Sequence, residues 1–117
     1  LVESTVERWF TRTYIDSSTP SLDRVREMIR QTPPQTFIRC GQTIKVLTQL
    51  DILKEVQSPT LVLVGAEDPS TPPAASKLIK DNIVGAEMEI ISQASHLLNV
   101  EQAESFNERL LQFLNTH

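Results

Sequence analysis

The sequence has little glycine, one cysteine and no cluster of basic residues. Its 117 residues include 3 glycines, and 39% of the residues are hydrophobic and 22% charged. This composition is that of an ordinary globular protein and excludes collagen-like and wholly disordered chains. The net charge is −4, which argues against a surface that neutralises nucleic-acid phosphates. No nucleic-acid partner is therefore expected.

Cysteine is limited to Cys40, so no disulfide can form within the chain. A site of Cys and His ligands would have only Cys40, His96 and His117 to use, and no metal or other cofactor is expected. An unpaired cysteine indicates a reducing compartment, so we expect a cytoplasmic location. Because Cys40 falls on an apolar helical pattern, we expect a small buried side chain there rather than a reactive thiol.

Long apolar runs are also missing. No run approaches the ~18 residues that a membrane-spanning helix needs, and no signal peptide opens the chain. No membrane partner is expected. The first residue is Leu rather than Met, which favours a processed protein or an excised fragment.

The first half of the chain, to about residue 56, shows apolar residues at helical spacing. The residues that define the first two helices are Val2, Val6, Trp9, Phe10 and Tyr14, then Leu22, Val25, Met28 and Ile29. Thr19 or Ser21 is expected to cap the second helix, and the Pro33-Pro34 pair to end it. A third helix is expected to carry Phe37, Cys40, Ile44 and Leu47 on one side, and a helical turn follows at 50–56.

The second half predicts one βαβ unit. Residues 60–64 form a continuous apolar run, typical of a strand covered on both faces, and 87–91 predict a second strand. Between them, Thr71-Pro72-Pro73 predicts a helix start whose inner face is Ala75, Leu78, Ile79 and Ile83, with Gly85 after its end. A last helix is expected to begin at Asn99, with Gln102 in a capping box and Phe106, Leu110, Leu111 and Leu114 on one face.

Two parallel strands cannot form a stable sheet alone. The helical first half cannot supply further strands. We therefore expect this chain to be the C-terminal part of a larger α/β protein, with the missing N-terminal part of the same fold as its partner. Pairing with a second copy, which gives a homo-oligomer, is the other way to cover the open edge.

Two polar side chains follow the two predicted strands. Asp68 comes four residues after the strand at 60–64, and His96 comes five residues after the strand at 87–91. Consecutive βα loops of a parallel sheet meet at the same edge, so the two side chains are expected to touch. A carboxylate that holds one imidazole nitrogen leaves the other free to take a proton from a nucleophile.

The nucleophile itself is missing from this sequence. A nucleophile elbow needs Gly-x-Ser-x-Gly, and no serine lies midway between any two of Gly41, Gly65 and Gly85. Ser92 and Ser95 lie near His96 but have no such motif. An acid followed by a histidine is the order of the later triad members in an α/β-hydrolase.

Each of these residues also has a structural interpretation. Asp68 could simply favour the start of the next helix, with Glu67 as a rival acid, and His96 could be a hydrogen-bonded loop residue. Trp9 and Leu97 belong either to the core or to the wall of a substrate pocket.

The segments VGAEDPSTPP and ASHLLNVEQAESFNERLLQFL resemble the C-terminal part of the α/β-hydrolase superfamily, and more narrowly the 3-oxoadipate enol-lactonases. Glu7-Arg8-Trp9-Phe10 and Thr32-Pro33-Pro34 resemble the cap of these lactonases. Haloperoxidase-like esterases share the two loops. The N-terminal portion of the family, with its oxyanion loop and nucleophile elbow, has no counterpart here.

The resemblance implies a helical cap at 1–56 and a βαβα part of the core at 57–117. It implies hydrolysis of a small enol-lactone in the β-ketoadipate route of aromatic catabolism, with Asp68 orienting His96 and the serine outside this chain. No cofactor is implied. Arg8, Arg12 and Arg39 are candidates to hold a substrate carboxylate. The alternatives are another carboxylic-ester hydrolase, a haloperoxidase-like esterase, or a non-catalytic relative that only binds.

Overall fold

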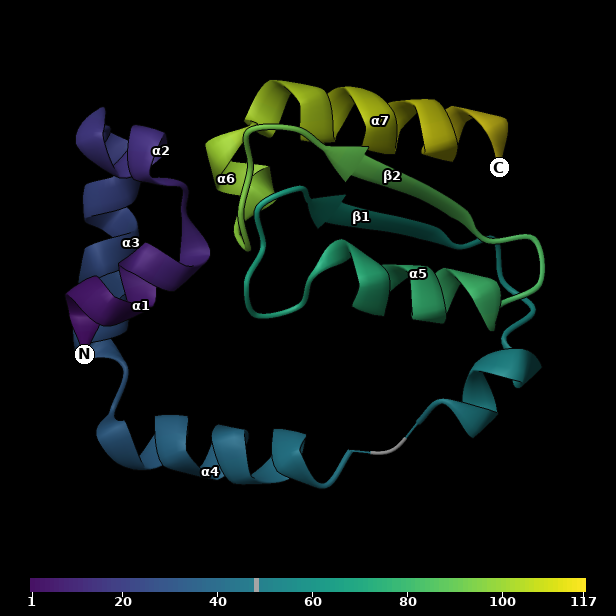
Figure 1. Cartoon of the computed structure of the whole chain (residues 1–117), viewed down its shortest axis with the longest axis horizontal. Helices are drawn as coiled ribbons and strands as arrows, with labels where there is room; N and C mark the ends of the chain where they lie inside the picture. The colour runs from purple at the N-terminus through teal and green to yellow at the C-terminus, as the bar shows by residue number, and fades with distance from the viewer. Residues whose placement is uncertain (48) are drawn as a thin grey trace.

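The computed structural model describes residues 1–47 and 49–117. Its first half is helical (Figure 1). The elements are α1 (Val2–Trp9), α2 (Arg12–Asp16), α3 (Pro20–Gln31), α4 (Pro34–Lys45) and a 3-10 helix η1 (Asp51–Glu55). Thr19 caps α3 as expected, because its hydroxyl accepts a hydrogen bond from the Leu22 backbone N–H.

The second half contains β1 (Leu61–Gly65), α5 (Pro73–Asp81) and β2 (Glu87–Ile91), followed by α6 (Leu98–Glu101) and α7 (Ala103–Thr116). The two strands are parallel, with Leu61 paired to Glu87 and Gly65 paired to Ile91. The sheet lies between α7 on one face and α5 on the other (Figure 1). The predicted βαβ unit and both strand positions are confirmed, with β1 one residue later than expected.

The buried core of the first half joins the two halves of the chain. Val6 and Phe10 of the α1 segment pack with Leu22 and Val25 of α3. Residues from the second half, Leu97 and Val100, pack against the same cluster. The segment that follows β2 is therefore anchored to the helices of the first half.

The apolar side predicted for the third helix is exposed in α4. All its residues are exposed, including Phe37 and Ile44, and Leu47 just beyond it is 53% exposed. Cys40 is exposed too, so its predicted burial is wrong. The physical reason is position: α4 lies along one side of the molecule, apart from the sheet (Figure 1), and within residues 1–47 and 49–117 its apolar side chains stay exposed.

Several expected core positions of α5 and α7 are also exposed, because a sheet of two strands covers only a narrow strip of each helix. The exposed apolar residues there are Leu78, Ile79, Leu111 and Leu114. Ile83, just after α5, is buried as expected, and the buried positions within the helices are Ser76 in α5 and Phe113 in α7. The expected capping box is absent as well: Asn99 lies inside α6, and no side chain caps α6 or α7.

Candidate functional site

Asp68 and His96 lie in contact where the two strands end. Asp68 Oδ2 is 2.8 Å from His96 Nδ1. The Asp68 side chain is 3% exposed, whereas that of His96 is 33% exposed. The loops after β1 and β2 therefore bring the two together as the sequence predicted, with the carboxylate inside and the imidazole at the surface.

The loop of residues 68–71 holds the Asp68 carboxylate. Its Oδ1 accepts hydrogen bonds from the backbone N–H groups of Ser70, at 2.8 Å, and Thr71, at 3.0 Å. Its Oδ2 accepts the Thr71 hydroxyl at 2.8 Å. Thr71 thus serves Asp68 and does not cap α5: that helix begins at Pro73 with Pro72 before it and no side-chain cap.

The pKa of Asp68 lies below its ordinary value. Burial alone raises this pKa, because it disfavours the charged form. The hydrogen bonds from the Thr71 backbone, His96, the Thr71 hydroxyl and the Ser70 backbone lower it, and together they outweigh burial. Asp68 is therefore held ionised and can accept the Nδ1 proton of His96.

Close approach of the backbone at Gly65 makes this arrangement possible. A Cβ built on Gly65 would lie 2.2 Å from the Ser95 carbonyl oxygen and 2.5 Å from that of Ala94. The next residues continue the contact, since the Glu67 N–H donates to the Ala94 carbonyl at 2.9 Å. Glycine at the end of β1 is thus what allows the His96 loop to lie against the Asp68 loop.

Trp9 lies beside His96. The centroids of the two rings are 6.4 Å apart, with an angle of 28° between the ring planes. The same tryptophan borders an apolar recess of about 120 Å³, whose other walls include Ile29 and Phe37. Trp9 and Leu97 both pack against the core cluster, and Trp9 also forms part of the wall of this recess. A substrate-binding role for Trp9 and Leu97 stays a prediction.

The three arginine candidates are not directed at the pair. Arg12 forms an ion pair with Asp16 at 3.0 Å. Arg8 donates to the Ser4 carbonyl, and Arg39 lies on exposed α4. In residues 1–47 and 49–117, none of the three hydrogen-bonds to Asp68 or His96.

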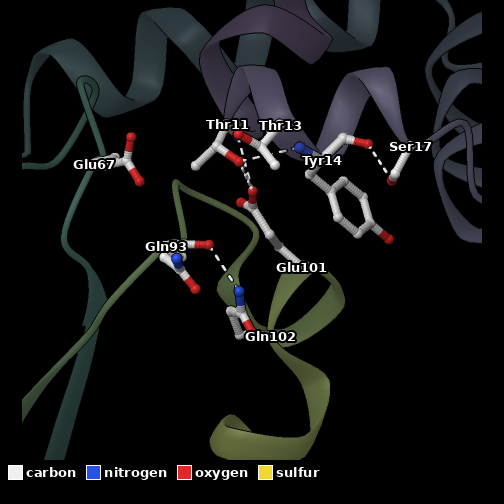
Figure 2. A pocket seen from close by; sticks show the side chains of 8 residues that line it. All are labelled: Thr11, Thr13, Tyr14, Ser17, Glu67, Gln93, Glu101 and Gln102. Atoms are coloured by element: carbon white, nitrogen blue, oxygen red, sulfur yellow. Dashed lines mark hydrogen bonds between the residues drawn. The ribbon is translucent and has the colours of Figure 1, made fainter.

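A pocket of about 430 Å³, lined by polar side chains, lies between α2 and the segments that follow β1 and β2 (Figure 2). Its walls include Thr11 and Thr13 of the first half together with Glu67, Gln93 and Glu101 of the second. Figure 2 shows Glu101 pointing from α6 toward Thr11. No pattern in the sequence pointed to Glu101. For Thr71, the turn sequence Asp-Pro-Ser-Thr was a signal, since an Asp side chain accepts backbone N–H groups two and three residues later.

Two further properties of the described residues concern metals and membranes. They contain no group of three or more His, Cys, Asp or Glu side chains that could hold a metal ion. No helix among them is both long and apolar enough to span a membrane.

No family model matches the sequence. The chain is 28% identical over 107 residues to 3-oxoadipate enol-lactonase 2 of Acinetobacter baylyi, a match that covers 92% of this chain and 40% of that protein. Its structure is similar to that of a hydrolase from Pseudomonas aeruginosa, with a TM-score of 0.89, 27% identity, and coverage of 97% and 42% of the two chains.

The chain has the fold of the C-terminal portion of an α/β-hydrolase. The enol-lactonase of Burkholderia xenovorans has the same fold, with a TM-score of 0.92 at 24% identity over 97% of this chain and 44% of that one. The chain thus spans well under half the length of these α/β-hydrolases. The expected α/β-hydrolase fold is confirmed.

Proposed function

We propose that this chain supplies the acid and the base of an α/β-hydrolase that cleaves a small enol-lactone, with 3-oxoadipate enol-lactone as the substrate and 3-oxoadipate as the product. The observation that carries the proposal is the 2.8 Å contact between Asp68 Oδ2 and His96 Nδ1. With Nδ1 engaged, Nε2 of a partly exposed imidazole remains for proton transfer.

The reaction follows from this geometry. A serine from outside this chain attacks the lactone carbonyl while His96 Nε2 takes its proton. The ring C–O bond then breaks, and His96 returns the proton to the leaving enol oxygen. Water then attacks the acyl-serine while His96 takes one of its protons. The bond between the serine oxygen and the acyl carbon breaks, His96 returns the proton to the serine oxygen, and the acid is released; the enol becomes the ketone. Asp68 stays ionised and stabilises the imidazolium that forms twice.

The organisation proposed for the chain is a cap at 1–56 and a core segment at 57–117. Trp9, which lies beside His96 and borders an apolar recess, supports a role for the first segment in shaping a substrate pocket. The open edges of the two-stranded sheet and the exposed apolar residues of α4 are surfaces that the rest of a longer hydrolase would cover. The unpaired, exposed Cys40 fits a reducing compartment such as the cytoplasm.

The test uses a full-length hydrolase that contains this chain. His96→Gln should lower kcat for the enol-lactone by several orders of magnitude, as removal of a triad member does. His117→Gln, at the far end of α7, is the matched control and should leave kcat unchanged. Near-normal turnover of His96→Gln would remove this residue from the mechanism.

A non-catalytic binding protein is the second candidate, because this sequence holds no Gly-x-Ser-x-Gly motif. A serine-reactive phosphonate separates the two candidates. The isolated 117-residue chain should form no adduct, whereas the full-length hydrolase should be labelled at one serine. A full-length protein that is not labelled and has no esterase or lactonase activity would favour the binding role.

A further inference from the structure

Glu101 is a buried carboxylate that binds two separate parts of the chain. It is 8% exposed and is the last residue of α6. Its Oε2 accepts the Ser95 backbone N–H at 2.8 Å. Its Oε1 accepts the Thr11 backbone N–H at 2.9 Å and also the Thr11 hydroxyl. Both oxygens are therefore occupied, one by the His96 loop and one by the start of α2.

The contacts of Glu101 belong to a larger set of hydrogen bonds on both sides of His96. Before it, the Ser95 hydroxyl donates to the Arg8 carbonyl at 3.2 Å. After it, the Leu97 N–H donates to the Trp9 carbonyl at 3.0 Å. The residues flanking the imidazole are thus bonded to the segment that carries the neighbouring tryptophan.

Only a carboxylate fits this place in the network. Glu101 accepts from three donors, and two of them are backbone N–H groups, which cannot accept a hydrogen bond. An amide in place of the carboxylate would turn its NH₂ group toward one of these N–H groups. The Thr11 hydroxyl could rotate to accept from it, but the Thr11 and Ser95 backbone N–H groups could not. A neutral isostere therefore leaves at least one buried donor without a partner.

We propose that Glu101 is a positioning residue for His96. The carboxylate holds the start of the His96 loop against the start of α2 and so fixes the imidazole at hydrogen-bond distance from Asp68. Glu101 does not reach the ring itself and takes no part in proton transfer. This inference rests on the proposed function, since it assigns Glu101 to the alignment of the base in that reaction.

The test reads the imidazole directly, in the full chain labelled with ¹⁵N in its histidine rings. The sequence has only two histidines, so His117→Gln identifies the His96 signals. The unsubstituted chain should show His96 protonated at Nδ1, with slow exchange of that proton. Glu101→Gln should speed this exchange on the order of tenfold, the size expected for a weakened buried hydrogen bond, and should populate the other tautomer.

Matched variants separate positioning from general stability. Thr11→Val removes one of the three donors without changing the shape of the side chain, and it should shift His96 in the same direction by less. Thr11→Ser keeps the hydroxyl and should restore the original signals. Glu104→Gln, an exposed change in the first turn of α7, and Phe113→Leu, which lowers stability far from the loop, should leave the His96 tautomer unchanged.

Two outcomes overturn the inference in different ways. If Glu101→Gln lowers the unfolding temperature but leaves the His96 tautomer and proton exchange as in Phe113→Leu, Glu101 is only structural, and the proposed triad stands. If the unsubstituted chain shows no Nδ1 proton on His96, the triad geometry fails, and the positioning role fails with it. In the full-length hydrolase, the expected kinetic counterpart is a lower kcat for Glu101→Gln with little change in KM.

Discussion

Gly65 ends β1 directly against Ser95, and a Cβ on Gly65 would meet the Ser95 carbonyl oxygen at 2.2 Å. The obstacle is backbone, which cannot rotate away as a side chain does. Gly65→Ala should therefore destabilise the chain by about 2 kcal/mol or more and move the His96 loop. Urea unfolding measures the first effect, and the His96 ring signals report the second.

Gly41 is the matched control for this prediction. It lies in α4 with no atom within 4 Å of an added Cβ. Gly41→Ala should be neutral or stabilising by up to about 1 kcal/mol, because alanine favours a helix interior. Equal losses in both variants would contradict the close-contact argument at Gly65.

The lowered pKa of Asp68 predicts a pH dependence of stability. A carboxylate that ionises more readily in the folded chain adds stability above its unfolded pKa, which is about 3.9. This contribution is lost as the pH falls from there through the lower, folded pKa. Urea titrations between about pH 7 and pH 2 should show that the acid loss is smaller in Asp68→Asn. An unchanged acid loss would contradict the assigned hydrogen bonds.

Truncation of Leu22 is expected to cause the largest loss of stability of any single substitution in the first half. The side chain is fully buried between α1 and α3. Leu22→Ala should lower the free energy of unfolding by about 2–5 kcal/mol, because it removes buried surface and leaves a cavity. Leu111→Ala, at a 58% exposed position, should change it by no more than about 0.5 kcal/mol.

Because Cys40 is exposed, its thiol should react rapidly with an aromatic disulfide reagent that releases a coloured thiolate. In the folded chain, the rate should approach that of the unfolded chain, because α4 leaves the thiol accessible. In a full-length hydrolase, the rest of the fold should cover α4 and slow the reaction of the Cys40 thiol with this reagent. Equal rates in the two proteins would argue against the proposal that the remaining part of the fold covers this helix.

The sequence predicted the fold where local pattern and tertiary packing agree. The strand at 87–91 was located to the residue, and the contact between Asp68 and His96 followed from strand ends alone. The exposure of α4, in contrast, could not be predicted from its own apolar pattern. An apolar stripe shows which face a helix would bury, but it does not show whether anything lies against that face.

The roles of two side chains near Asp68 and His96 were not predicted from the sequence. Thr71 stands where a helix cap is usual, yet its hydroxyl turns to Asp68, because the loop folds around the carboxylate. Glu101 was assigned no role from the sequence, and only the approach of Thr11, 90 positions earlier, makes it a buried acceptor. The Asp-Pro-Ser-Thr turn is a local signature of the first arrangement, whereas the second has none.

The Arg8 and Trp9 contributions to the hydrogen bonds around His96 come from their backbone carbonyls. Their side chains make separate contacts: that of Arg8 donates to the Ser4 carbonyl, and that of Trp9 lies beside the His96 ring. Replacing the Arg8 side chain would leave the main-chain anchor of the base in place, so a change there would alter which molecules this edge binds without realigning the imidazole. The Arg8 side chain could then change which substrate binds, while the Arg8 carbonyl continues to hold the loop that aligns His96.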